Sequence, residues 1–105
     1  MMPVIAVALF GATLAVTVTE HVPNFDIRPS CHAATSLMTL DPKREARCID
    51  DEATARTEVT KQWASFSATE RQRCTAEAQL NGMPSYVDLL ECLTLGREAK
   101  AGGPN

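Results

Sequence analysis

Four cysteines constrain the fold of this chain more than any other feature. Cys31, Cys48, Cys74 and Cys92 are even in number and all follow an apolar leader in a sequence of only 105 residues. This arrangement is typical of a disulfide framework in an exported protein. Covalent links of this kind support small domains whose hydrophobic core stabilises the fold only weakly. The cysteines therefore predict two disulfides.

The cysteine spacing also bears on metal and redox chemistry. A structural zinc site usually takes two ligands from one turn, as Cys-x-x-Cys, and a redox-active pair uses the same spacing at a helix start. The sequence contains no Cys-x-x-Cys pair. An enzyme or metal-binding protein centred on His32 and the cysteines stays as an alternative, and it requires free thiols.

Residues 1–19 form an apolar leader without a charged side chain, and the first charge is Glu20. The densest part of the run, residues 4–18, is shorter than the ~20 residues of a membrane-spanning helix, so it resembles the apolar part of a signal peptide. Residues 13–15, Thr-Leu-Ala, offer a small-x-small cleavage site, although no Lys or Arg precedes the run. We expect a signal peptide and a periplasmic or secreted protein, with an uncleaved apolar anchor or a buried core helix as alternatives.

The first two predicted helices follow from apolar periodicity and start signals. Ile27, Cys31, Ala34 and Met38 share one face of a helix that Asp26 opens, with Pro29 in its first turn. Asp41-Pro42 is a helix start, and a long second helix should follow it. This second helix carries a predicted apolar stripe and a candidate ion pair between Glu52 and Arg56, four residues apart. The stripe consists of Ile49, Ala53, Val59, Trp63 and Phe66, with Arg56 among them.

Two further helices are predicted in the second half of the chain. Ser67-Ala68-Thr69-Glu70 has the form of a capping box, and Ser85-Tyr86-Val87-Asp88 repeats that pattern. The third helix should end at Asn81-Gly82, and the fourth at Gly96. We therefore predict an all-α domain over residues 26–96, a small bundle of about four short helices, followed by a flexible tail at 97–105.

Helix register favours one of the three cysteine pairings. In an antiparallel hairpin, residues equally far from the turn face each other, so the midpoint of a bridge should fall in a turn. The pairs Cys31–Cys48 and Cys74–Cys92 have midpoints in the turns near Leu40 and Met83. The nested pair Cys48–Cys74 has its midpoint inside the second helix and fits less well. The favoured pairing predicts two disulfide-stapled helical hairpins.

No residues emerge as catalytic. His32 and His21 have no evident partner, and nucleophile elbows, phosphate loops and His-Glu-x-x-His are absent from the sequence. Asp50-Asp51-Glu52 is a tight acidic cluster, but successive helical residues point about 100° apart and cannot converge on one ion, so we interpret it as a solvated helix face. The 10 basic and 13 acidic residues form no basic patch for nucleic acid. We predict no enzyme activity and no cofactor.

Three aromatic residues are the candidates for partner binding. Trp63, Phe66 and Tyr86 stand near predicted helix ends where the second and fourth helices meet. A shared core is the first interpretation of these side chains. The alternative is an exposed aromatic patch, because Trp and Tyr are favoured anchors of protein interfaces.

Several segments resemble a group of small exported proteins of alphaproteobacteria with four cysteines and no assigned activity. The similarity lies in Trp63-Ala-Ser-Phe66, Arg73-Cys74 and the stretch from Ser85 to Leu93, with a looser match at residues 26–29 and Cys31. It would span about residues 26–97. The resemblance implies export and a shared small helical fold, and it transfers no catalytic residue.

Three functions are carried forward from the sequence. The first is a non-enzymatic protein-binding or structural component of the bacterial cell envelope, with an unknown protein partner, no nucleic acid, and no membrane contact beyond the leader. The second is a periplasmic holdase that exposes apolar faces when acid protonates its carboxylates. The third is the metal-binding alternative that requires free thiols.

Overall fold

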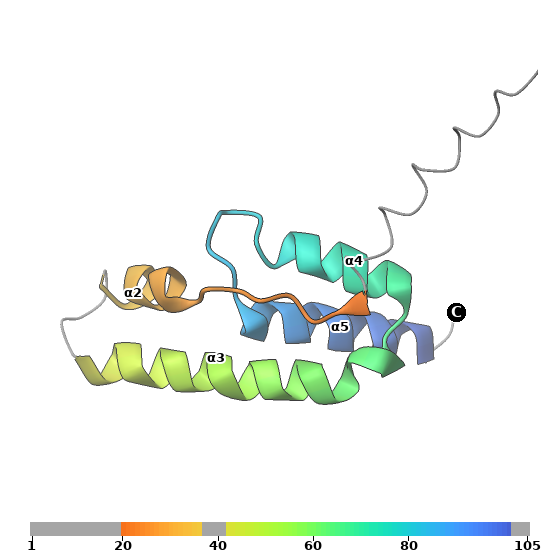
Figure 1. Ribbon diagram of the computed structural model, residues 1–105, viewed down its shortest axis with the longest axis horizontal. Helices are drawn as coiled ribbons and strands as arrows, with labels where there is room; N and C mark the ends of the chain where they lie inside the picture. The colour runs from red at the N-terminus through yellow and green to blue at the C-terminus, as the bar shows by residue number, and fades with distance from the viewer. Residues whose placement is uncertain (1–19, 37–41, 102–105) are drawn as a thin grey trace, which may run out of the picture.

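The fold is all-α, as the sequence predicts. The computed structural model describes residues 20–36 and 42–101, in which four α-helices and one short 3-10 helix follow an extended segment at 22–27 (Figure 1). The first hairpin pairs α2 (Arg28–Ser36) with α3 (Pro42–Gln62), and the second pairs α4 (Ala68–Glu77) with α5 (Tyr86–Ala101). Helix α5 lies between α3 and α4 and contacts both. The 3-10 helix η2 (Trp63–Ser65) follows α3 directly.

The two disulfides lie inside the hairpins. Cys31–Cys48 joins α2 to α3 and Cys74–Cys92 joins α4 to α5, each with a Cα–Cα distance of 5.6 Å. The predicted neighbour pairing is therefore confirmed. Cys31 and Cys74 are fully buried, so each bridge anchors its hairpin to the interior. The predicted turn near Leu40, with Met38 and Asp41, lies outside the described residues, as do 1–19 and 102–105.

Three predicted helix starts carry the expected side-chain caps. Asp26 Oδ1 accepts a hydrogen bond from the Arg28 amide at 3.3 Å. Ser67 Oγ accepts from the Glu70 amide at 3.1 Å, and Ser85 Oγ accepts from the Asp88 amide at 3.1 Å. These hydroxyl and carboxyl oxygens satisfy amides that have no partner within the helix. The side chain of Arg28 also donates to Asp26, which holds the pKa of that carboxyl below its usual range.

The buried face of α3 is rotated from the predicted stripe. Ala53 and Arg56 are exposed, so the predicted stripe does not face the core at these two positions. They border a hollow between α3 and the extended segment, which covers that side of the helix only partly. The buried positions follow a helical spacing that turns α3 toward α5. They are Glu52, Ala55, Val59 and Trp63, and they are packed with Phe66, Tyr86, Leu89 and Leu93.

Helix α4 is shorter than predicted. It ends at Glu77 with Ala78 as its C-cap, so the predicted end at Asn81-Gly82 was wrong. Tight turns follow, and the Ser85 amide donates to the Ala78 carbonyl at 3.2 Å, which closes the connection to α5. Gly82 has φ of +71°, a left-handed conformation that glycine adopts without a side-chain clash.

Helix α5 is longer than predicted, because it continues through Gly96 to Ala101. The predicted stop at Gly96 was wrong, and the first five residues of the predicted tail are helical. Gly96 faces α4, because a Cβ built on it would lie 2.6 Å from Glu70 Oε2, at the end of a flexible side chain. The guanidinium of Arg97 lies 4.6 Å from the centroid of the Phe66 ring, a cation–π contact that supports the added turns.

The folded unit also begins before the predicted boundary at residue 26. Tyr86 donates its hydroxyl proton to the Pro23 carbonyl and accepts from the Phe25 amide, both at 2.7 Å. The rings of Phe25 and Tyr86 lie 4.9 Å apart. These contacts fix the extended segment over α5. No helix within residues 20–36 and 42–101 combines the length and apolar character needed to cross a membrane.

We predict that each disulfide stabilises the fold by a similar amount. Replacing Cys74 and Cys92 by alanine should lower the free energy of unfolding by about 3 kcal/mol, because the lost bridge no longer restricts the unfolded chain. Urea denaturation followed by circular dichroism measures this change. The Cys31–Cys48 bridge closes a loop of nearly the same length, with a sequence separation of 17 against 18 residues. Replacing Cys31 and Cys48 by alanine should therefore lower the free energy of unfolding by as much. An unchanged midpoint for either pair would contradict the prediction.

Candidate functional site

Glu52 joins the two hairpins. Its side chain projects from α3 and is 5% exposed. One carboxylate oxygen accepts from Ser85 Oγ at 2.6 Å and the other accepts from the Tyr86 amide at 2.5 Å. Both donors lie at the start of α5, so a buried carboxylate of the first hairpin caps a helix of the second. A carboxylate is stabilised there by the charge-assisted hydrogen bonds and by the positive end of the helix dipole.

This role of Glu52 was missed in the sequence analysis. The solvated helix face predicted for Asp50-Asp51-Glu52 is correct for the exposed Asp50 and Asp51 and wrong for Glu52. The predicted ion pair with Arg56 is absent among the described residues, because the carboxylate is engaged by α5 and the Arg56 guanidinium lies over the Tyr86 ring. The signal was its spacing, since Glu52 is three and seven residues before Ala55 and Val59 on the buried face.

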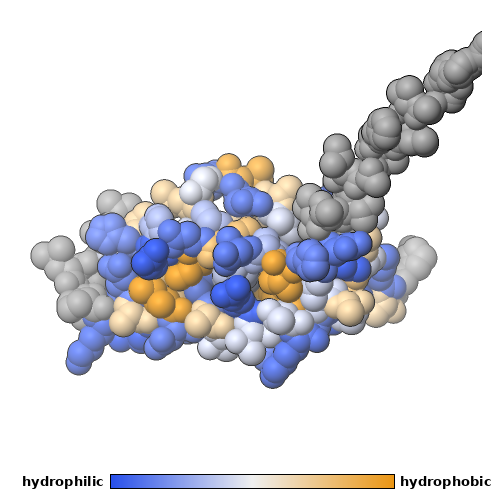
Figure 2. Space-filling view, viewed as in Figure 1, coloured by the Kyte–Doolittle hydropathy of each residue, from blue (hydrophilic) through white to orange (hydrophobic). Residues whose placement is uncertain are grey.

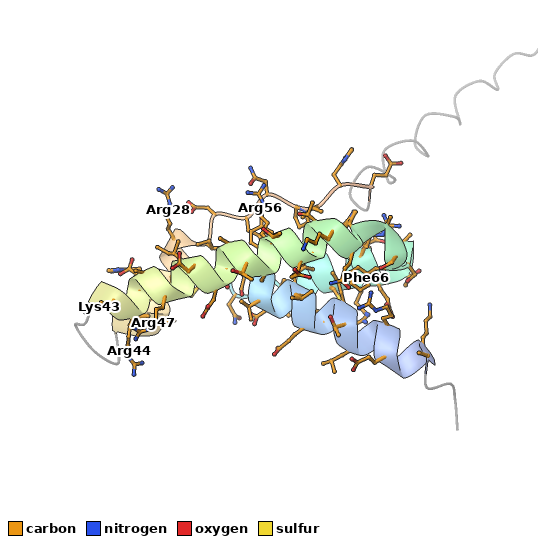
Figure 3. The ribbon with its side chains drawn as sticks, turned by 90° about the horizontal axis from the view of Figure 1, so that it is seen from below. Arg28, Lys43, Arg44, Arg47, Arg56 and Phe66 are labelled. Atoms are coloured by element: carbon orange, nitrogen blue, oxygen red, sulfur yellow. A yellow bond between two sulfur atoms is a disulfide. The ribbon has the colours of Figure 1, made fainter. Side chains whose placement is uncertain are left out.

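The three aromatic candidates form part of the core. Trp63, Phe66 and Tyr86 are 7%, 2% and 2% exposed and belong to one cluster with Leu89 and Leu93. Figure 3 shows Phe66 at the end of α3, where the chain turns toward α4. The first interpretation, a shared core, therefore describes their positions. They are not available as an exposed aromatic patch.

The cysteines and His32 offer little for thiol or metal chemistry. All four cysteines are in disulfides, so the alternative that required free thiols lacks its nucleophile and its ligands. His32 is exposed, and its Nδ1 lies 3.2 Å from Glu45 Oε1 across the first hairpin. Within residues 20–36 and 42–101, no three His, Cys, Asp or Glu side chains converge as metal ligands would.

The exposed large apolar side chains of the described chain all belong to the second hairpin. Leu80 and Met83 lie in the loop between α4 and α5, and they are 76% and 48% exposed. Val87 and Leu95 lie on α5, and they are 36% and 64% exposed. Figure 2 shows apolar side chains at the top of the molecule, where this loop lies. We refer to these four exposed side chains together as the apolar face of the second hairpin.

Two hollows border this face. One, of about 270 Å³, lies between the end of α4 and α5, and it is lined by Glu77, Ala78, Asp88, Glu91, Cys92 and Leu95. The other, of about 390 Å³, is mostly apolar and lies between the two hairpins, where Met83, Ala33 and Ala34 meet Glu52 and Asp88. Asp88 lines both hollows, so they adjoin at this residue.

The charged residues within the second hairpin's apolar stretch are all acidic, and a basic residue flanks it. From Cys74 to Gly96 the charged residues are Glu77, Asp88 and Glu91, and the sequence has no Lys, Arg or His in that interval. The basic side chains marked in Figure 3 lie elsewhere, with Lys43, Arg44 and Arg47 at the start of α3. Arg73 pairs with Glu77 at 3.1 Å, so Asp88 and Glu91 are the carboxylates of the hollow between α4 and α5 that have no ion pair among the described residues.

The comparisons with known proteins add no family. No family model matches this chain. No curated protein and no solved structure is significantly similar to it. The resemblance to exported alphaproteobacterial proteins stays a prediction, and we infer function from the contacts and surfaces described above.

We predict that neutralising Glu52 weakens the fold. The substitution Glu52→Gln keeps the shape of the side chain and removes its charge, so the hydrogen bonds to Ser85 and Tyr86 lose their charge assistance. The free energy of unfolding should fall by about 1–3 kcal/mol in urea denaturation. The control is Asp51→Asn on the exposed side of α3, which should change stability by less than about 0.5 kcal/mol. Equal effects of the two substitutions would remove Glu52 from its proposed role.

Proposed function

We propose that this chain is an exported, non-enzymatic protein-binding component of the bacterial cell envelope that acts through the apolar face of the second hairpin. One observation carries the proposal. All four exposed large apolar side chains of the described residues lie between Leu80 and Leu95, although the rest of that hairpin is well packed. Exposed apolar surface with a polar border is typical of protein interaction sites.

The chemistry of the remaining groups supports binding over catalysis. All four cysteines form disulfides and have no free thiol. The side chains of Trp63, Phe66 and Tyr86 are buried in the core. The hollows are open grooves on a thin helical molecule, whereas substrate sites are usually enclosed clefts that exclude water. What the surface offers a ligand is a pre-formed apolar and acidic face on a covalently restrained hairpin.

The two disulfides support an extracytoplasmic location. Structural disulfides form and persist in oxidising compartments such as the periplasm and the cell exterior. Both bridges are local to a hairpin and join helices that already pack together, so they serve stability. An apolar leader at residues 1–19 fits the same route, and we place the protein in the periplasm or outside the cell.

The test is capture of a partner from cell-envelope extract with matched surface variants. The bait is the tagged chain, compared with Leu80→Ser plus Leu95→Ser and with a control that changes two exposed residues of α3, Ala46→Ser plus Thr54→Ser. We expect a defined partner that the control variant retains and the leucine variant loses. A partner retained equally by both variants, or capture of none, would contradict binding through this face.

A second candidate function, an acid-activated holdase, is favoured by the position of Glu52. Its carboxylate accepts from Ser85 Oγ and the Tyr86 amide, and a neutral side chain at this position would remove the charge assistance of both hydrogen bonds. Glu52 lines two hollows, and the other charged side chain is Arg56 in one of them and Asp88 in the other. Because no disulfide crosses between the hairpins, loss of this contact would leave the shared apolar cluster to hold them, and acid that also loosens this cluster would expose the apolar faces between them.

This candidate predicts a specific pH dependence. The wild-type protein should suppress aggregation of an unfolded client at a pH of about 2–3, below the usual range of carboxyl groups, and should not do so at neutral pH. The variant Glu52→Gln imitates the neutral carboxyl group and should show activity at neutral pH. Light scattering of the client measures both. Suppression that is absent at low pH would eliminate the holdase function.

A further inference from the structure

We propose that the partner of the second hairpin presents a basic amphipathic helix. This inference rests on the proposed function and adds the chemistry of the partner. It follows from two properties of the same surface, the direction in which its apolar side chains are arranged and the sign of the charges beside them.

The arrangement along α5 suits a helix. Val87, Glu91 and Leu95 follow one another at intervals of four residues, so they lie on one side of α5 over a length of about 12 Å. The hollow between α4 and α5 runs beside Leu95 and Glu91, with Ala78 and Cys92 in its lining. A helix laid into this groove would add a further helix to the hairpin, with its apolar side toward Leu95 and Ala78. Recognition of an amphipathic helix by a groove is a recurrent mode of peptide binding.

The border charges select the sign of the partner. Glu77 is paired with Arg73 at 3.1 Å, whereas Asp88 and Glu91 have no ion pair with a basic side chain in the part of the chain that the structure describes. Both carboxylates line the groove. Lys and Arg at the edges of the apolar side of a bound helix would reach them, whereas Asp or Glu there would be repelled. A second copy of this chain fits less well, because its basic residues at the start of α3 are interspersed with Glu45, Asp50 and Asp51.

Two designed peptides test the inference on the full oxidised protein. Each is a helix of about 18 residues with leucines on one side, and the other side carries lysine in one peptide and glutamate in the second. Fluorescence anisotropy of the labelled peptides measures binding. We expect the lysine peptide to bind and the glutamate peptide to bind at least tenfold more weakly, with affinity for the lysine peptide falling as salt is added.

Matched variants separate the groove from the overall charge of the protein. Asp88→Asn plus Glu91→Gln should lower the affinity for the lysine peptide about three- to tenfold, because each substitution removes one carboxylate that would pair with a lysine of the peptide. The control Asp50→Asn plus Asp51→Asn removes the same charge from the exposed side of α3 and should leave affinity unchanged. Circular dichroism establishes that both variants are folded. Equal weakening by the two variants would mean non-specific attraction and would overturn the proposal.

The failure of this inference is distinguishable from failure of the proposed function. Equal binding of both peptides, or binding of the glutamate peptide alone, would overturn the basic partner while leaving the apolar face as a binding surface. An envelope partner lost on changing Leu80 and Leu95, together with binding of neither peptide, would likewise overturn the basic helix and keep the binding surface. Self-association that Leu95→Ser abolishes, measured by sedimentation, would assign the face to a second copy and would also overturn the proposal.

Discussion

The contact between Glu52 and the start of α5 is the interaction on which the arrangement of the two hairpins depends. Each disulfide acts inside one hairpin, so neither covalent link holds α3 against α5. The carboxylate of α3 supplies that link by accepting from Ser85 Oγ and the Tyr86 amide. Tyr86 then extends the connection, because its hydroxyl group binds the backbone of the extended segment. Around these polar contacts the apolar cluster of α3, α4 and α5 excludes water.

Much of this fold could be predicted because its signals are local. The serines at 67 and 85 cap helices as their patterns indicate, and the equal distance of paired cysteines from a turn identified both bridges. The ends of α4 and α5 could not be placed, because both depend on contacts between distant residues. The Ser85 amide closes the turn after α4 on the Ala78 carbonyl, and the Arg97 guanidinium at the end of α5 lies over the Phe66 ring. The candidate surface was missed for a similar reason. Which of the leucines in the second hairpin remain exposed depends on where α3 packs, and α3 packs on α5 through the shared apolar cluster and the Glu52 hydrogen bonds.

The chain uses most of its distinctive residues for stability. The four cysteines restrain the hairpins, and the three aromatic candidates fill the core. Leu80, Met83, Val87 and Leu95 are different, because they are exposed although burying them would favour folding. Their position beside Asp88 and Glu91, with no basic residue between Cys74 and Gly96, gives this surface a defined chemical character. Disulfide restraint of the hairpin that carries it lowers the entropy cost of association.

A double-mutant cycle between Glu52 and Ser85 tests the central claim most directly, namely that a buried carboxylate of the first hairpin holds the second. Unfolding free energies of the wild-type protein, Glu52→Ala, Ser85→Ala and the double variant give the coupling between the two side chains. Because the oxygens lie 2.6 Å apart and the contact is largely buried, we predict a coupling of about 1 kcal/mol or more. Additive effects of the two substitutions would contradict the account, because they would mean that the hairpins are joined without this contact.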